Sequence, residues 1–394
     1  MIDKVKSSML VEKASIPLCV PVISGNEWEY VKECLDTGWI SSAGSYVDRF
    51  EGDVCGYTGA KHAIACVNGT AALQTALEIT GTQQSDEVLV PTVTFIASVN
   101  AVSYIGARPV FMDCDEYYNI DVEKVLDFVE KETVFRDGHT YNKITGRRVS
   151  AIVIVHVFGN AVNIEPLINV CKERNIKVIE DAAESIGSYY TDGLLKDRHT
   201  GTIGDVGCYS FNGNKIITAG GGAMIVTNNR EYAQKARYLT TQAKDDQVRY
   251  IHNQIGYNYR LTNIQAALGV AQLERLDEFI AVKKENYNNY KCAVDGIFGL
   301  HLTWVPAYAK NNYWMYALQI KEDYKEDKEA LMERLASEGI QTRPVWYLNH
   351  LQKPYKDCQS YKIEKAYQMH KETLTLPCSV SLMKQDIDYV ASKL

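Results

Sequence analysis

The chain has 394 residues, 46% hydrophobic and 23% charged, so it can bury a large core and form more than one domain. Its formal net charge of -7 argues against a nucleic-acid-binding protein and against a polybasic membrane anchor. The 10 cysteines form no Cys-x-x-Cys pair, and we find no signal peptide and no apolar stretch long enough to cross a bilayer. We therefore expect a cytoplasmic protein with reduced cysteines, no metal site and no membrane contact.

The first predicted helix follows a mixed, irregular N-terminal segment at 1–25. Residues 26–37 have helical spacing, and their apolar side chains share one face: Trp28, Val31 and Leu35. A loop of small residues at 38–44 separates this helix from a short second helix.

From about residue 60, short β-branched runs alternate with helical segments. The predicted strands are 62–67, 87–91, 108–113, 151–158, 177–181, 206–211 and 224–227. The predicted helices between them are 71–80, 94–105 and 166–174. Alternation of this kind predicts an α/β fold whose mostly parallel sheet is flanked by helices on both faces.

Two segments interrupt this pattern, and a third region ends it. An Asp-Gly turn between β-prone residues predicts a surface hairpin inserted at about 133–150, and we interpret 189–194 in the same way. After Thr262 the sequence is strongly helical to about Tyr290. We therefore predict a large α/β domain at 26–275 and a smaller α+β domain at 276–394.

The stretch 209–222 carries a lysine, Lys215, in a small polar turn between an apolar run and three glycines. Burial of this turn disfavours the ammonium form, and a neutral amine is the nucleophile that a Schiff-base lysine needs. An isolated lysine is more often a surface residue. The residues at the neighbouring strand ends are therefore needed to choose between these two interpretations.

Other polar or aromatic residues follow predicted strands at what should be the carboxyl edge of the sheet, where open α/β sheets bind ligands. The turn 68–70 opens a helix and suits a phosphate, although a helix cap without a ligand has the same sequence. Asp181 ends a buried strand and is either a structural cap or the partner of a protonated ring nitrogen. Ser210 adds a hydroxyl, and Phe95 either covers a flat ring or packs in the core.

The order of these features resembles the fold type I aminotransferases, and most of all the DegT/StrS-type sugar aminotransferases. The resemblance covers nearly the whole chain, in the segments 38–44, 68–73, 91–98, 156–159, 180–187, 204–222, 256–269 and 341–355. Its most specific motifs are Ser-Phe-x-x-x-Lys at 210–215 and Glu-Asp-Ala-Ala-Glu at 180–184. It implies an aspartate aminotransferase-like fold and a pyridoxal phosphate-dependent transaminase.

Three runs are similar to enzymes that aminate C4 of nucleotide-linked 4-keto-6-deoxy-N-acetylhexosamines in bacillosamine and legionaminic acid synthesis: 210–218, 257–263 and 342–346. The implied substrates are such a keto sugar and L-glutamate, and the implied product serves a bacterial surface glycan such as lipopolysaccharide.

The resemblance also implies roles for individual residues. Lys215 is expected to form the Schiff base and to move the proton, Asp181 to bind the pyridine nitrogen, and Glu184 to contact the phenolic oxygen. Phe95 is expected to stack on the ring, and the phosphate is expected to bind Gly69, Thr70 and Ser210.

The resemblance further implies a homodimer with composite active sites, because Asn258 is expected to reach the phosphate of the cofactor bound to the partner subunit. The candidate substrate-binding residues are Trp39, Ser41, Lys196, Arg260, Arg343 and His350. From sequence alone, His156 is either a core histidine or part of the site.

Four alternatives remain open or fail at this point. A relative that aminates C3 of a keto sugar, or a cyclitol ketone, would differ only near the sugar. The dehydratase branch of the family lacks the Schiff-base lysine, so Lys215 argues against it. A regulator is disfavoured by the absence of a helix-turn-helix segment or basic patch in the sequence. A dinucleotide-binding protein needs Gly-x-Gly-x-x-Gly after its first strand, where this chain has Asn-Gly-Thr.

Overall fold

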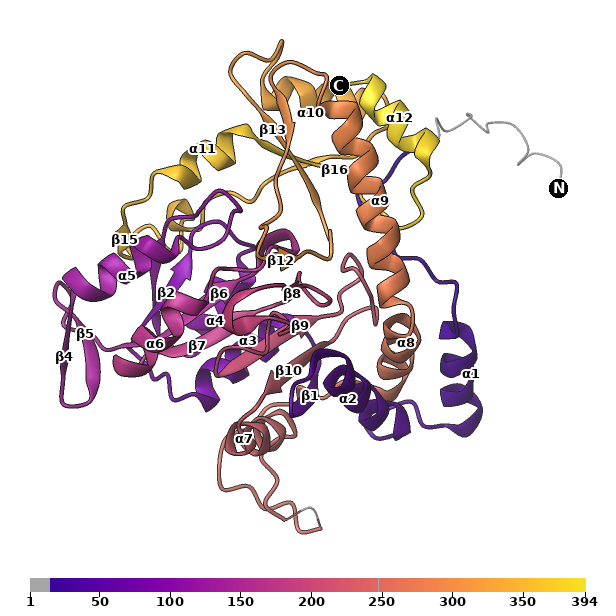
Figure 1. Cartoon of the computed structure of the whole chain (residues 1–394). Coiled ribbons are helices and arrows are strands. Elements are labelled where there is room, and N and C mark those ends of the chain that lie inside the picture. Colours follow the sequence, from indigo (N-terminus) through magenta and orange to yellow (C-terminus); the bar gives the residue numbers. More distant parts are fainter. Residues whose placement is uncertain (1–14, 247) are drawn as a thin grey trace, which may run out of the picture.

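The computed structural model describes residues 15–246 and 248–394. Its centre is an eight-stranded sheet in the order β1-β10-β9-β7-β6-β2-β3-β15 (Figure 1). Only β10 runs antiparallel to its neighbours within this sheet, so the predicted mostly parallel sheet is confirmed. The strands are β1 (His62–Cys66), β2 (Glu87–Pro91), β3 (Arg108–Met112), β6 (Val149–Val155), β7 (Lys177–Asp181), β9 (Val206–Ser210), β10 (Ala223–Thr227) and β15 (Ser360–Tyr361).

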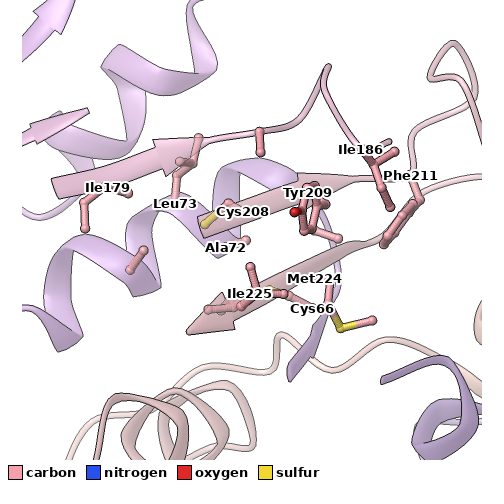
Figure 2. Close-up of a cluster of buried hydrophobic side chains, with 14 of the residues drawn as sticks. Cys66, Ala72, Leu73, Ile179, Ile186, Cys208, Tyr209, Phe211, Met224 and Ile225 are labelled. Atoms are coloured by element: carbon pink, nitrogen blue, oxygen red, sulfur yellow. The ribbon is translucent and has the colours of Figure 1, made fainter. Parts of the chain in front are cut away.

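Both faces of the large sheet are buried, because successive residues of its central strand point into different cores. Along β6, Val153 belongs to one hydrophobic cluster, whereas its neighbours Ile152 and Ile154 belong to the other. Figure 2 shows part of the first cluster, where Leu73 and side chains from β7, β9 and β10 pack together. A strand buried on both faces has to be apolar throughout, which explains the uninterrupted β-branched run in the sequence.

Helices cover both faces of this sheet, as predicted. The cluster on one face includes side chains from α3 (Gly69–Ile79) and α4 (Ala97–Tyr104), and the other includes side chains from α5 (Val122–Lys131) and α6 (Glu165–Glu173). The other α-helices that the structure describes before residue 275 are α1 (Glu27–Thr37), α2 (Ser45–Thr58), α7 (Arg230–Thr240) and α8 (Asn263–Leu273).

The C-terminal part contains a second sheet, in the order β11-β13-β16-β14, which packs with α9 and α12 around a third hydrophobic cluster (Figure 1). The last part of the chain also returns to the large sheet, where β15 pairs with β3. The elements are α9 (Leu276–Val294), β11 (Leu300–Leu302), β12 (Ala309–Lys310), β13 (Tyr316–Ile320), α10 (Lys328–Ser337), β14 (Arg343–Pro344), α11 (Lys365–Glu372), β16 (Thr373–Leu376) and α12 (Lys384–Ser392).

Two surface segments that the sequence treats alike differ in the structure. β4 (Thr133–Arg136) and β5 (His139–Asn142) form the predicted hairpin. The predicted hairpin at 189–194 is longer in the structure: β8 (Tyr189–Tyr190) has its ladder with β12 (Ala309–Lys310), and the chain returns beside β8 only at His199, which bridges to Tyr189. Gly193–Leu195 forms a short 3-10 helix instead of a returning strand. Local turn residues therefore do not identify the partner strand.

The apolar face predicted for the first helix is largely exposed in the single chain. Trp28 and Leu35 are 79% and 59% exposed, whereas α1 buries Glu27 and Cys34. Among the described helices, none has the length and apolar character that crossing a bilayer requires.

Candidate active site

A cavity of about 550 Å³ lies at the carboxyl ends of β1, β7 and β9, between the large sheet and the second sheet. Antiparallel β10 enters at the same edge, with Gly221 and Gly222 in the lining. Eight of the predicted site residues line this one cavity: Gly69, Thr70, Phe95, Asp181, Glu184, Ser210, Lys215 and Arg343. Strand order brings them together, because their positions in the sequence are far apart.

One wall of the cavity is the N-terminus of α3. The side chain of Asn68 caps this helix by accepting a hydrogen bond from the Ala71 N–H at 2.9 Å. The preceding N–H groups have no partner within the helix, and the helix dipole adds positive potential there. A Cβ atom on Gly69 would lie 3.3 Å from the Cβ of Ser210, so the glycine lets β9 approach the helix closely. The wall thus offers backbone and hydroxyl donors to a phosphate.

Asp181 ends β7 with its carboxylate buried and fixed. Ser98 donates a hydrogen bond to Oδ2 at 2.6 Å, and the Ala183 N–H donates to Oδ1 at 3.1 Å. Burial raises the pKa of Asp181 despite these donors. A cationic nitrogen in the cavity would compensate the buried carboxylate. The sequence did not identify Ser98, since a serine in the first turn of a helix is too common to stand out.

Lys215 is held between an aromatic ring and a carboxylate. Its Nζ lies 4.2 Å from the ring centroid of Trp314 and 3.8 Å from Oε1 of Glu184. The indole N–H of Trp314 donates to the Asn214 carbonyl at 2.7 Å, which ties the ring to the lysine turn. The side chain of Lys215 is 13% exposed. The lysine side chain is therefore largely enclosed, although its turn is not buried as predicted, because Asn212 and Asn214 are exposed. Its nearest carboxylate comes from another strand end.

Glu184 faces Lys215 from the turn after β7. Its Oε2 accepts the Phe158 N–H at 2.8 Å. Burial raises the pKa of Glu184 to about 7, although Lys215 and the Phe158 N–H favour the ionised form. The carboxyl therefore changes its protonation state near neutral pH. Phe158 is itself in a left-handed conformation, with φ of 56°.

His156 belongs to the core below the cavity. Its Nδ1 accepts the Val162 N–H at 3.1 Å, so the ring carries its proton on Nε2, which donates to Oε2 of Glu180 at 2.9 Å. The same carboxylate accepts three backbone N–H groups, from Gly201, Ile203 and Gly204. Glu180 thus anchors the loop that leads into β9, and His156 is a structural partner of this anchor.

Asn258 and Arg260 line a different cavity, of about 920 Å³, together with residues of α2, β1 and α7. This cavity is larger than the one around Lys215, but size does not decide which is the active site. The Lys215 cavity combines a half-buried amine with two buried carboxyl groups whose pKa values are raised, which is typical of catalytic sites.

The other candidate substrate residues are dispersed in the single chain. Trp39 lines a third cavity of about 360 Å³, and the Ser41 carbonyl accepts the Asn263 N–H at 2.6 Å. Lys196 is exposed and, like His350, lies outside these three linings in the described part of the chain. His350 hydrogen-bonds Thr92 and Tyr367, and burial lowers its pKa.

The donor set of the Lys215 cavity fits pyridoxal phosphate. A phosphate would bind at the start of α3 and at Ser210, a pyridinium nitrogen would pair with Asp181, and Lys215 supplies the amine. Aromatic walls come from Phe95, Phe158, Trp314 and Trp346. Of these, the sequence identified only Phe95, because no local pattern separates a cavity-lining aromatic residue from a core one.

The comparisons with known proteins agree with this fit. Residues 21–394 match the model of the DegT/DnrJ/EryC1/StrS aminotransferase family. A GDP-perosamine synthase from Caulobacter vibrioides is 38% identical over 96% of this chain and 97% of its own, and one from Escherichia coli O157:H7 is 37% identical over 96% and 97%. The crystal structure of the aminotransferase TlmJ from Streptoalloteichus hindustanus has a TM-score of 0.85 at 26% identity, covering 96% of this chain and 97% of that one.

The match spans the whole large sheet, the second sheet and the lining of the Lys215 cavity apart from Leu18. The structural likeness also confirms the predicted fold type I architecture. The chain therefore belongs to the DegT/DnrJ/EryC1/StrS family and is an aminotransferase of nucleotide-sugar pathways whose cofactor is pyridoxal phosphate.

Proposed function

We propose that the protein transfers an amino group from L-glutamate to C4 of a nucleotide-linked 4-keto-6-deoxy sugar. The observation that carries this proposal is the gathering of Lys215, Asp181, Ser210 and the start of α3 in one cavity. These groups are what a transaminase needs to hold its cofactor and to move a proton.

Pyridoxal phosphate, when bound, supplies an electron sink that stabilises negative charge on the substrate carbon. Asp181 would pair with the ring nitrogen in its cationic form, and Phe95 would cover one face of the ring. Gly69, Thr70 and Ser210 would hold the phosphate, and Glu184 would face the phenolic oxygen. Lys215 supplies an amine, and its Nζ can take up a proton and return it.

Two sugar classes are supported by different observations. The runs at 210–218, 257–263 and 342–346 resemble those of enzymes acting on N-acetylated 4-keto-6-deoxyhexosamines for legionaminic acid or bacillosamine. The relatives named GDP-perosamine synthase, 37% and 38% identical, favour a GDP-linked 4-keto-6-deoxyhexose as the second candidate. Arg343 is the predicted cation that lines the Lys215 cavity and is available to the nucleotide diphosphate.

We also infer that the protein acts as a homodimer in which Asn258 completes the site of the partner subunit. Asn258 is exposed and lines a cavity other than that of Lys215. Large apolar side chains are also exposed nearby in the same loop, including Val248 and Ile255 at 85% and 83%. Mixing Lys215→Ala and Asn258→Ala proteins should restore part of the activity that each lacks, because one site of a mixed dimer is intact. If the mixed dimers recover no activity, the composite site is refuted.

The reaction is tested with the cofactor-loaded protein, L-glutamate and a panel of GDP-, UDP- and TDP-linked 4-keto-6-deoxy sugars, with and without the N-acetyl group. We expect mass spectrometry to find a 4-amino product from one class, and Lys215→Ala to yield none. Turnover by Lys215→Ala, or amination at C3 in place of C4, would contradict the proposal.

A further inference from the structure

We propose that Glu184 is a second acid–base residue of the site, which accepts a proton directly from Lys215 and later returns it. The proposal rests on the assignment of Lys215 in the proposed function, and it adds a partner that takes up the lysine proton inside the protein. The contact that carries it is the 3.8 Å between Oε1 of Glu184 and Nζ of Lys215.

The two carboxyl oxygens of Glu184 have different surroundings. Oε2 is occupied by the Phe158 N–H at 2.8 Å, and Oε1 points to the lysine. The backbone of Glu184 is fixed as well, because the side-chain amide of Asn312 donates to its carbonyl at 2.8 Å and to that of Ile186 at 3.0 Å. The carboxyl therefore has one anchored oxygen and one oxygen free to exchange a proton.

The anchor depends on strained backbone. Phe158 adopts φ of 56°, a conformation that a bulky side chain rarely has. The next residue is held by Ser188, whose hydroxyl donates to the Gly159 carbonyl at 2.7 Å. Such strain persists when the surrounding structure enforces it, and it is found mainly at functional sites. Here it directs one N–H group at Glu184.

The nucleophilic step of Lys215 needs an acceptor for the proton of its ammonium form. Lys215 can act as a nucleophile only after its ammonium group has lost a proton, and the side chain is 13% exposed. In the transfer, an Nζ–H bond breaks, an Oε1–H bond forms, and the electron pair stays on nitrogen. The distance of 3.8 Å is longer than a hydrogen bond, and catalytic contacts of this kind shorten when ligand binds.

Within the described part of the chain, two charged groups face the Glu184 carboxyl: Lys215 from the turn after β9, and Asp181 from the end of β7. Asp181 is already bonded to Ser98 and the Ala183 N–H. Glu184 is therefore the carboxyl within reach of Nζ, and its pKa of about 7 suits exchange in both directions at neutral pH. A glutamine could accept the same Phe158 N–H without the cost of a buried ionisable group.

The test compares Glu184→Gln with a matched control, Asp115→Asn. Asp115 is also a carboxyl whose pKa burial raises to about 7, and it accepts the N–H groups of Tyr117 and Asn119 away from the Lys215 cavity. The half-reaction with L-glutamate is followed by stopped-flow absorbance between about pH 5 and about pH 9, which covers the ionisation. The visible spectrum of the loaded enzyme is titrated without substrate over the same range.

We expect the wild type and Asp115→Asn to show one ionisation near neutral pH in both measurements. Glu184→Gln should lose it, and its half-reaction should slow by about tenfold or more although its cofactor content is unchanged. An unchanged profile in Glu184→Gln would overturn the inference, as would a rate within about twofold of the wild type.

If Glu184→Gln does not fold, the pH profile of Glu184→Asp tests the inference instead. The shorter acid should keep an ionisation in the profile at a reduced rate, and a pH-independent profile would overturn the inference. The half-reaction involves no sugar, so this result is independent of the sugar assignment. If Glu184 has no acid–base role, the products formed from the sugar panel stay the same. If Lys215→Ala is active, the proposed function itself is wrong.

Discussion

Glu180→Gln tests whether one buried carboxylate holds the loop that leads to the lysine strand. Each oxygen of Glu180 accepts two hydrogen bonds, at 2.6 Å from Ile203 and from Gly204, and at 2.8 Å and 2.9 Å from Gly201 and His156. A glutamine replaces one oxygen by an NH₂ group, which then faces two donors. No rotation of the amide avoids this conflict, because both positions are surrounded by donors.

The expected loss follows from the donors left unpaired. A buried donor without its partner costs about 1–3 kcal/mol, so two of them reduce the free energy of unfolding by about 4 kcal/mol. Urea unfolding of the cofactor-free protein, followed by far-ultraviolet circular dichroism, measures this difference. The control is Glu285→Gln on the exposed face of α9, which should stay within about 0.5 kcal/mol of the wild type.

The same pair of proteins has a pH signature. Burial opposes ionisation of Glu180, but the hydrogen bond from His156 and the N–H groups of Gly204 and Gly201 outweigh it, so its pKa lies below the usual 4.5. A group whose pKa is lowered by folding contributes stability at a pH above its unfolded-state pKa, and this stability is lost as the pH falls through its folded-state pKa. The difference from Glu180→Gln should therefore shrink in acid. A loss below about 1 kcal/mol at neutral pH, or a difference independent of pH, would refute the anchor.

Three further changes test the cavity. Gly69→Val should weaken cofactor binding by about tenfold or more in an absorbance titration, because a Cβ there lies 3.3 Å from a side chain of β9, whereas Gly56→Val has open space and should not. Ser98→Ala removes a hydrogen-bond donor to Asp181, so it should raise the pKa of Asp181 further and weaken cofactor binding by about tenfold. Cofactor binding equal to that of the wild type would refute this role of Ser98. Because folding raises the pKa of Glu184, this group contributes stability at a pH below its unfolded-state pKa of 4.5. The contribution is lost as the pH rises through about 7. The cofactor-free Glu184→Gln protein should therefore gain about 3 kcal/mol over the wild type between these limits in urea unfolding, and a constant difference would contradict the burial argument.

The local pattern of the sequence was enough for the elements that carry most of the site. β2 and β7 have the predicted bounds, because each is a buried run limited by turn residues on both sides. The predicted strand 151–158 instead ends at Val155. Phe158 turns into the cavity in a left-handed conformation, which cannot be predicted from a phenylalanine in the sequence. The helices α5 and α7 were missing from the prediction, although each buries an apolar stripe: Val125, Phe128 and Val129 in α5, and Ala233, Ala236 and Leu239 in α7.

By itself, the sequence determined the α/β class and the family resemblance, and it predicted Lys215, Asp181, Ser210 and Glu184 among the site residues. These residues follow strands whose patterns are local, and parallel strands end at one edge of the sheet. Only the tertiary structure decided which other side chains meet them. Glu184 lies beside Lys215, Ser98 beside Asp181, and His156 beneath the cavity as the partner of a structural carboxylate. Strand order creates these contacts, and periodicity along the chain carries no information about which strands become neighbours.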